Sequence, residues 1–182
     1  MYYKRDIKMA KKIRQYFGLF IGIIVYFIIH EGAHFIYSSL IGTFKSVNFM
    51  SLGIQIDVYH ELMSDMQMGI FCFVGPLATL IVAYIFVLFT PHFSKLSFKI
   101  VKASFYYSTL ALLFVDPLYL SVLSRFVGGG DMNGIVLLIP KNIMTITFVL
   151  IFIFNLYIFL RKVLPLYKIK TDPKGERSVG QN

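Results

Sequence analysis

Long runs of apolar residues alternate with short polar segments along most of the chain. The first run extends from about residue 17 to residue 40, which is longer than the apolar part of a signal peptide. The second covers residues 68–90 without a charged side chain, and its helix is expected to end at Pro91. Two further runs cover about 103–124 and 135–160. Because about 20 apolar residues span a bilayer as a helix, the pattern predicts four transmembrane helices.

Residues 41–67 lie between the first two apolar runs and follow a different pattern. In the stretch VNFMSLGIQIDV, polar and apolar side chains alternate around Gly53, and such alternation is typical of β-strands. We therefore expect a short, membrane-associated hairpin here. The predicted fold class is an all-α membrane protein with about four transmembrane helices and one β-hairpin-like segment between the first two helices.

The fourth apolar run begins irregularly. The glycine-rich stretch RFVGGGDMNG precedes it, and Pro140 followed by Lys141 interrupts its first turns. Because a proline disrupts the helix that precedes it, the start of this run is expected to be a separate or re-entrant piece. We interpret the chain as one membrane unit with a basic arm over 1–15, a core over 16–160 and a basic, polar tail over 161–182.

Composition supports a membrane location and excludes several other classes. Of the 182 residues, 57% are hydrophobic, and the mean hydropathy of +0.71 is too high for an ordinary soluble domain. The net charge of +9 does not indicate nucleic-acid binding, because the basic residues cluster at the two ends and in one short loop. The single cysteine, Cys72, excludes an internal disulfide and a cysteine-rich metal site.

The distribution of lysine and arginine predicts the orientation in the membrane. The arm before the first apolar run contains six of them, and the 91–102 loop and the segment after residue 160 are also basic. Residues 41–67 contain only Lys45. Because cytoplasmic segments are enriched in Lys and Arg, we expect both termini on the cytoplasmic side. We therefore predict an integral membrane protein of a lipid bilayer, located in the bacterial plasma membrane.

Three ionisable side chains, His30, Glu31 and His34, lie inside the first apolar run in the motif HEGAH. An ionisable group at membrane depth costs a few kcal/mol, so such groups survive where they pair, bind an ion or line a cavity. Residues four apart share one face of a helix, so His30 and His34 can bind one metal ion through their ring nitrogens. A structural polar cluster between helices is the alternative interpretation.

The order of these residues also has a chemical meaning. His-Glu-x-x-His is the helical motif of zinc metalloproteases, in which the glutamate acts as general base. Zinc lowers the pKa of its bound water towards about 7, and a neighbouring carboxylate can take the proton and later deliver it to the leaving amine. We therefore predict one Zn²⁺ per chain, with His30 and His34 as ligands and Glu31 as the catalytic base.

A catalytic zinc site needs a third protein ligand. Asp131, in the glycine-rich stretch, is the first candidate, because glycines let a backbone approach a site closely; otherwise it is a solvated loop acid or a helix cap. Asp116, inside the third apolar run, is the alternative ligand, or a partner that orients a ligating histidine. His60 and Glu61 are a third candidate, for which a position in an interfacial loop is the simpler interpretation.

Taken in order, three elements resemble those of the site-2 protease family of intramembrane zinc metalloproteases. HEGAH matches the His-Glu-x-x-His helix, VGPLATL resembles the Gly-Pro-x-x-Asn element through Gly75 and Pro76, and GGDMNG resembles the Asp-Gly element. Thr79 stands where the family has asparagine, and Gly-Asp-Met-Asn-Gly replaces the usual Leu-Asp-Gly. The similarity extends over about residues 20–140.

The resemblance implies that Asp131 supplies the third zinc ligand and that Gly75, Pro76 and Thr79 contribute to substrate binding or gating. It also implies that the hairpin offers an edge to an unwound substrate strand. The implied reaction is hydrolysis of peptide bonds in or near the transmembrane segments of a membrane protein or peptide. Many family members hold their zinc nearer the cytosolic face, whereas the charge distribution here places HEGAH towards the outer face.

Two other functions compete with this one. The first is a non-catalytic metal-binding membrane protein, such as a transporter subunit or a degenerate protease relative. The second is a lipid-modifying oxidase of the membrane, which needs several histidine clusters to hold two irons, and the chain has only four histidines. Glu31 discriminates between the protease and the transporter, because only a hydrolase needs a base beside the metal. The sequence indicates no particular oligomeric state.

Overall fold

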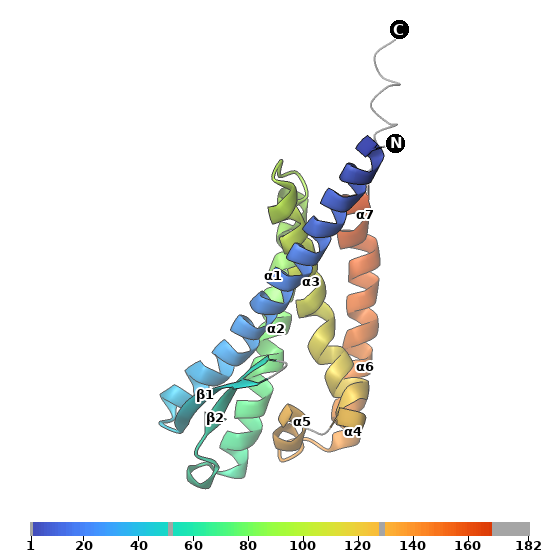
Figure 1. Cartoon of the computed structure of the whole chain (residues 1–182). Coiled ribbons are helices and arrows are strands. Elements are labelled where there is room, and N and C mark those ends of the chain that lie inside the picture. The colour runs from blue at the N-terminus through green and yellow to red at the C-terminus, as the bar shows by residue number, and fades with distance from the viewer. Residues whose placement is uncertain (1, 51–52, 128–129, 169–182) are drawn as a thin grey trace.

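The computed structural model describes residues 2–50, 53–127 and 130–168 (Figure 1). Within these residues the chain is mostly helical, and a two-stranded hairpin follows the first long helix. The described part contains four helical segments that are long and apolar enough to cross a bilayer: Met9–Leu40, Asp65–Phe93, Lys99–Val127 and Lys141–Tyr167. The predicted fold class is therefore confirmed, and these segments identify an integral membrane protein.

The described elements, in chain order, are α1 (Tyr2–Leu40), β1 (Phe44–Met50), β2 (Gly53–Val58), η1 (His60–Leu62), α2 (Asp65–Phe93), α3 (Lys99–Leu118), η2 (Tyr119–Leu123), α4 (Ser124–Val127), α5 (Gly130–Ile135), α6 (Lys141–Ile158), η3 (Phe159–Val163) and α7 (Leu164–Lys168). The turns η2 and η3 are π-helical and join the helices on either side into continuous rods. The start of α1 and α7 lie at one end of the molecule, and the hairpin and α5 lie at the other (Figure 1).

Three helix boundaries differ from those expected from the sequence. The basic arm is not separate, because α1 begins at Tyr2 and continues into the first span. The prediction that Pro91 ends the second helix is wrong, since α2 continues to Phe93; a proline in the last turn removes only one hydrogen bond close to the helix end. The fourth rod continues beyond residue 160 to Lys168, and 169–182 lie outside the described residues.

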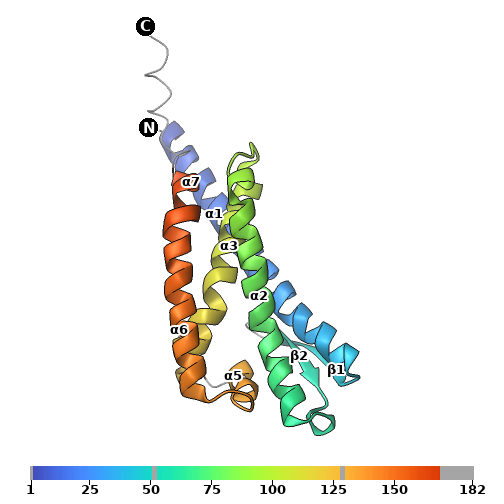
Figure 2. The ribbon, with the colours of Figure 1, turned by 180° about the vertical axis from the view of Figure 1, so that it is seen from behind.

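The last part of the glycine-rich stretch lies in the short helix α5 (Gly130–Ile135), which packs on α2 near the end of the molecule (Figure 2). A separate turn then leads to α6, whose N-cap is Pro140, as the interrupted pattern predicts. A Cβ atom at Gly134 would lie 3.1 Å from the Met68 carbonyl oxygen and would press on the Cys72 sulfur. Only glycine therefore lets α5 lie this close to α2.

The two strands of the hairpin are antiparallel, and their residue pairs run from Met50–Gly53 at one end to Phe44–Val58 at the other. Ile56 and Val58 of β2 are buried with residues of α2 and α5, so this strand faces the interior of the protein. Near the open end, Lys45 and Asp57 form an ion pair of 3.0 Å. The lysine holds the pKa of Asp57 below its usual value, and the carboxylate raises the pKa of Lys45.

One buried amide joins three of the long helices. Pro117 in α3 has no N–H group, so the Leu113 carbonyl one turn earlier lacks its intrahelical donor. Asn155 of α6 donates its side-chain N–H to this carbonyl at 2.6 Å and accepts the Tyr84 hydroxyl of α2 at 2.9 Å. Asn155 has no exposed surface. Its side chain therefore satisfies the polar group that the proline leaves and links α2, α3 and α6.

Two glycines bring α1 and α3 into direct backbone contact. A Cβ atom at Gly18 would lie 2.9 Å from the carbonyl carbon of Ala103, and one at Gly22 would lie 2.8 Å from that of Tyr107. Both positions are buried. Small residues four apart on a transmembrane helix allow such close approach. The contact fixes how far α1 can turn or slide relative to α3.

Gly22→Ala is expected to destabilise the protein by about 1–3 kcal/mol, because the added methyl group meets the backbone of α3 and forces the helices apart. The measurement is the midpoint of thermal unfolding of the purified protein in detergent. Gly32→Ala is the matched control on the same helix, since a Cβ atom there meets nothing within 4 Å. Equal midpoints for the two variants would contradict the proposed contact.

Candidate metal centre

The residues of HEGAH belong to a longer face of α1. Buried or partly buried residues recur every fourth position along this helix, and they are Gly18, Gly22, Tyr26, His30, His34 and Ser38. Positions four apart form one stripe along a helix. The glycines hold the first part of this stripe against α3, so the histidines further along it face the interior of the protein and not the lipid.

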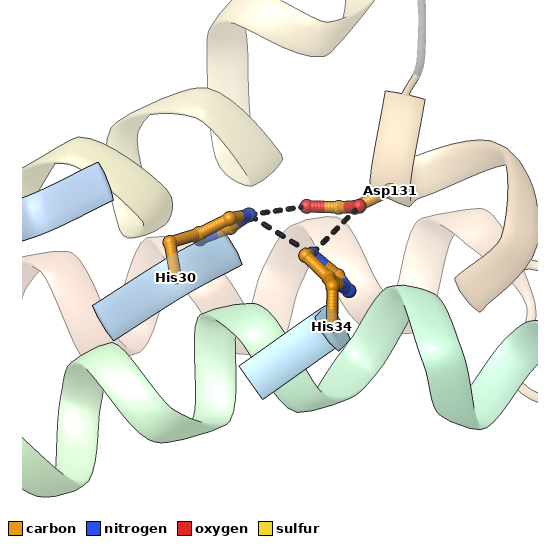
Figure 3. Close-up of side chains that lie close together, drawn as sticks. All are labelled: His30, His34 and Asp131. Carbon is orange, nitrogen blue, oxygen red and sulfur yellow. Dashed lines mark hydrogen bonds and ion pairs between the residues drawn. The ribbon is translucent and has the colours of Figure 1, made fainter. Parts of the chain in front are cut away.

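His30, His34 and Asp131 meet in one cluster (Figure 3). The Nε2 atoms of the two histidines are 3.1 Å apart. The carboxylate oxygens of Asp131 lie 3.0 Å from His30 Nε2 and 3.5 Å from His34 Nε2. The histidines are 6% and 3% exposed. Three ligand atoms therefore face one another. Two of them belong to residues one helical turn apart, and the third belongs to a residue about 100 positions later in the chain.

The spacing of these three atoms fits the requirements of a zinc ion. Zn–N and Zn–O bonds are about 2.0–2.1 Å long, so two ligands of a tetrahedral zinc lie about 3.3–3.4 Å apart. The distances of 3.0, 3.1 and 3.5 Å are close to this value. Two imidazoles and one carboxylate also make the three-ligand set of a catalytic zinc, which leaves a fourth position open.

Gly75 provides the wall of the cluster on the α2 side. A Cβ atom at this position would lie 2.5 Å from His34 Nε2 and 2.9 Å from His30 Nε2. The backbone of α2 thus lies against the two nitrogen atoms that would hold the metal. The absence of a side chain at Gly75 keeps this space open. The neighbouring Pro76 is buried within α2.

Glu31 is placed beside the cluster and is not one of its three ligand residues. Its side chain is partly exposed, and its Oε2 atom accepts the backbone N–H of Ile56 in β2 at 3.0 Å. The carboxylate also interacts electrostatically with His30, His34 and Asp131. The hairpin therefore holds this carboxylate next to the cluster, while leaving one oxygen without a bond to the backbone.

Asp116 lies on the other side of His30 from Asp131. Its oxygens are 3.3 Å from His30 Nδ1, whereas Asp131 contacts Nε2. The two ring nitrogens of an imidazole point in different directions, so one metal ion cannot bind to Nε2 and to Asp116 together. Of the two aspartates considered as the third ligand, Asp131 is the one that the structure brings to the side of the ring where His34 lies.

Thr79 has no exposed surface, and its hydroxyl lies within hydrogen-bond distance of Asp116 and of the Pro76 carbonyl. These contacts hold the hydroxyl between α2 and α3. A contribution of Gly75, Pro76 or Thr79 to substrate binding or gating stays a prediction. His60 and Glu61 are exposed in η1, at the end of the hairpin, and do not belong to the cluster. Their position agrees with the simpler interpretation of an interfacial segment.

Tyr26 is the residue at this site that the sequence interpretation missed. Its hydroxyl donates to Asp116 at 2.6 Å and lies 3.4 Å from His30 Nδ1. The signal was present, because Tyr26 lies one turn before His30 on the same stripe of α1. A tyrosine in an apolar run rich in aromatic residues does not by itself indicate a polar contact, which is why the position was overlooked.

A scan against models of known protein families gave no match, and comparisons with curated proteins and with solved structures gave no significant match either.

Proposed function

We propose that this protein is an intramembrane zinc metalloprotease. The proposal is carried by one observation: His30, His34 and Asp131 converge within 3.0–3.5 Å of one another in a chain whose helices are long and apolar enough to span a bilayer. Burial of these groups without a partner for their charges and lone pairs would be costly in lipid. A divalent cation would satisfy all three ligand atoms at once.

The charges of the surrounding groups support a divalent ion. Asp131 and Asp116 contribute two carboxylates around His30, and both contact its ring nitrogens. With Glu31 beside them, three carboxylates lie around the two histidines, and a divalent cation would offset two of the three negative charges, which lowers the cost of placing them within a low-dielectric environment. A bound zinc ion would supply Lewis-acid polarisation of the scissile carbonyl and of an attacking water.

The residues of the chain itself have distinct roles in the proposed reaction. His30, His34 and Asp131 hold the metal, and Glu31 takes a proton from the attacking water and later delivers it to the leaving amine. Ile56 anchors one oxygen of Glu31 through its backbone N–H, so the other oxygen is available for this proton transfer. Gly75 of α2 places no side-chain atom against the two Nε2 atoms that would hold the metal.

The proposed substrate is a transmembrane segment of a protein or peptide that enters the site unwound. Peptide bonds within a helix are shielded by their own hydrogen bonds, so the segment must be extended before it can be hydrolysed. The hairpin, on the Glu31 side of the site, provides strands that an extended chain can join. The orientation proposed from the basic residues places both termini in the cytoplasm and the metal centre towards the outer face.

The same metal site also suits a non-catalytic metal-binding protein. The bond from Ile56 to Glu31 favours this second candidate to some extent, because it gives the carboxylate a structural partner. The two candidates differ in what Glu31 must do, and the Glu31 variant considered in the Discussion separates them.

Detergent-purified wild-type protein is expected to contain about one zinc ion per chain and to cleave a transmembrane reporter peptide until the metal is removed by a chelator. His34→Ala and Asp131→Ala should each lose most of the metal, because two remaining protein ligands do not hold zinc tightly. The measurements are elemental analysis and peptide cleavage. His60→Ala is the control, since His60 is exposed and lies outside the cluster. Wild-type protein without a bound transition metal would contradict the proposal.

A further inference from the structure

A buried carboxylate lies behind the candidate metal centre. The Asp116 side chain is 1% exposed, and it accepts hydrogen bonds from the Tyr26 hydroxyl at 2.6 Å and from the Thr79 hydroxyl. Its oxygens also lie 3.3 Å from His30 Nδ1. Tyr26 and His30 come from α1, Thr79 from α2 and the carboxylate from α3. Three of the helices around the centre, α1, α2 and α3, thus meet at this one side chain.

Both ring nitrogens of His30 face a carboxylate, Asp116 at Nδ1 and Asp131 at Nε2. An ionised carboxylate only accepts hydrogen bonds, so with a metal bound between Nε2 and Asp131 the proton of a neutral His30 lies on the nitrogen that faces Asp116. That nitrogen is Nδ1, at 3.3 Å. In a neutral imidazole, Nε2 then has a free lone pair. This Nε2 is the atom that faces His34 and Asp131, so the tautomer whose Nδ1–H donates to Asp116 is the one that can bind a metal there.

Tyr26 and Thr79 hold the carboxylate in this position. Without them, two of the lone pairs of Asp116 would be buried without a donor, and the carboxylate could rotate or shift away from His30. Tyr26 also lies against the His30 ring, with 5.4 Å between the ring centroids. The Thr79 hydroxyl therefore acts on His30 through Asp116, and the Tyr26 hydroxyl acts both through Asp116 and by its position 3.4 Å from His30 Nδ1.

His34 is held in a different way. Its Nδ1 atom is buried and has no hydrogen-bond partner among the described residues. Its ring packs against Phe71 of α2, with 4.6 Å between the ring centroids. Only one of the two histidines thus has a carboxylate behind it. This difference makes the hydrogen bonds around Asp116 specific to His30 and not a general property of buried histidines in this protein.

We propose that Tyr26, Thr79 and Asp116 are positioning residues that fix the tautomer and the ring orientation of His30, and so set the affinity of the centre for its metal. The inference rests on the metal site proposed above. It does not depend on hydrolysis, because the same positioning would serve a non-catalytic metal site. Partners of this kind typically contribute 10- to 100-fold to metal affinity.

The test is a titration of metal-stripped, detergent-purified protein with Zn²⁺ in competition with a chromophoric chelator. Asp116→Asn is expected to weaken zinc binding by about 10- to 100-fold. Thr79→Val and Tyr26→Phe, which each remove one hydroxyl that donates to Asp116, should weaken it by up to about tenfold. Thr79→Ser retains the hydroxyl and should restore the wild-type affinity. Substitution with Co²⁺ should give altered d–d absorption bands in the weakened variants.

Two matched controls separate positioning from general packing. Thr109 is equally buried, but its hydroxyl donates only to the Phe105 carbonyl of its own helix. Tyr84 of α2 donates instead to Asn155 of α6. Thr109→Val and Tyr84→Phe should therefore leave zinc affinity unchanged. Wild-type zinc affinity in Asp116→Asn and in Thr79→Val would overturn the inference and leave the metal site standing. A wild-type protein that binds no zinc would overturn both.

Discussion

Glu31→Gln is expected to lower the rate of peptide cleavage by about 10²- to 10⁴-fold while the protein keeps its zinc. The loss follows from the removal of the general base, whose contribution to hydrolysis is of this size. The metal remains because Glu31 is not among the three residues whose ligand atoms converge. A glutamine retains a carbonyl oxygen that can accept the Ile56 N–H, so the hairpin should stay in place. The measurements are cleavage of a transmembrane reporter peptide and elemental analysis of the same preparation.

Glu61→Gln is the matched control for this variant. Glu61 is exposed in η1 and lies outside the cluster, so its replacement should change neither cleavage nor metal content. Unchanged cleavage in Glu31→Gln, in protein that still cleaves in a zinc-dependent way, would show that another group takes the proton. A wild-type protein that binds zinc and cleaves no transmembrane peptide would favour the non-catalytic candidate.

The second large effect is expected for Gly75→Ala, which should remove most of the bound zinc and lower cleavage by about 10²-fold or more. The added Cβ atom would lie 2.5 Å from His34 Nε2 and 2.9 Å from His30 Nε2. Both rings must move by several tenths of an ångström to about one ångström to relieve these contacts, and displacements of that size are sufficient to disrupt a reactive geometry. Zinc affinity by chelator competition and cleavage of the reporter peptide are the two measurements.

A methyl group of the same size serves as the control for Gly75→Ala. Gly32 lies between Glu31 and His34 in the chain, yet a Cβ atom there meets nothing within 4 Å. Gly32→Ala should keep its zinc and its activity, and the higher helix propensity of alanine should stabilise α1 slightly. If Gly75→Ala bound zinc as tightly as Gly32→Ala, the metal could not lie where the two Nε2 atoms converge.

The sequence predicted the parts of the structure that depend on local spacing. Four apolar runs have the length of a bilayer, and the alternation around Gly53 has the period of a strand, so the spans and the hairpin followed from pattern alone. His30 and His34 share a helical face because they are four residues apart. Asp131 was selected for its glycine-rich surroundings and by the family resemblance, and the structure places it beside both histidines.

Contacts between helices could not be predicted in this way. Tyr26 and Asp116 are 90 residues apart in the chain, and their hydrogen bond depends on how α1 crosses α3, which two glycines determine. The sequence therefore left two alternatives for Asp116, third ligand or orienting partner. In the structure, Asp116 lies at His30 Nδ1. Thr79 was considered for its place in a motif, whereas its hydroxyl direction depends on the packing of α2 against α3.

If the protein is the proposed protease, the glycine contact between α1 and α3 restricts where a bulky peptide can enter. If α1 slipped by a single turn along its neighbour, His30 would travel about 5.4 Å and leave Asp116 behind. Rolling α1 outward would break the backbone contacts at Gly18 and Gly22. In the proposed protease, this seam therefore stays shut during turnover, and a polypeptide would have to enter elsewhere than between α1 and α3.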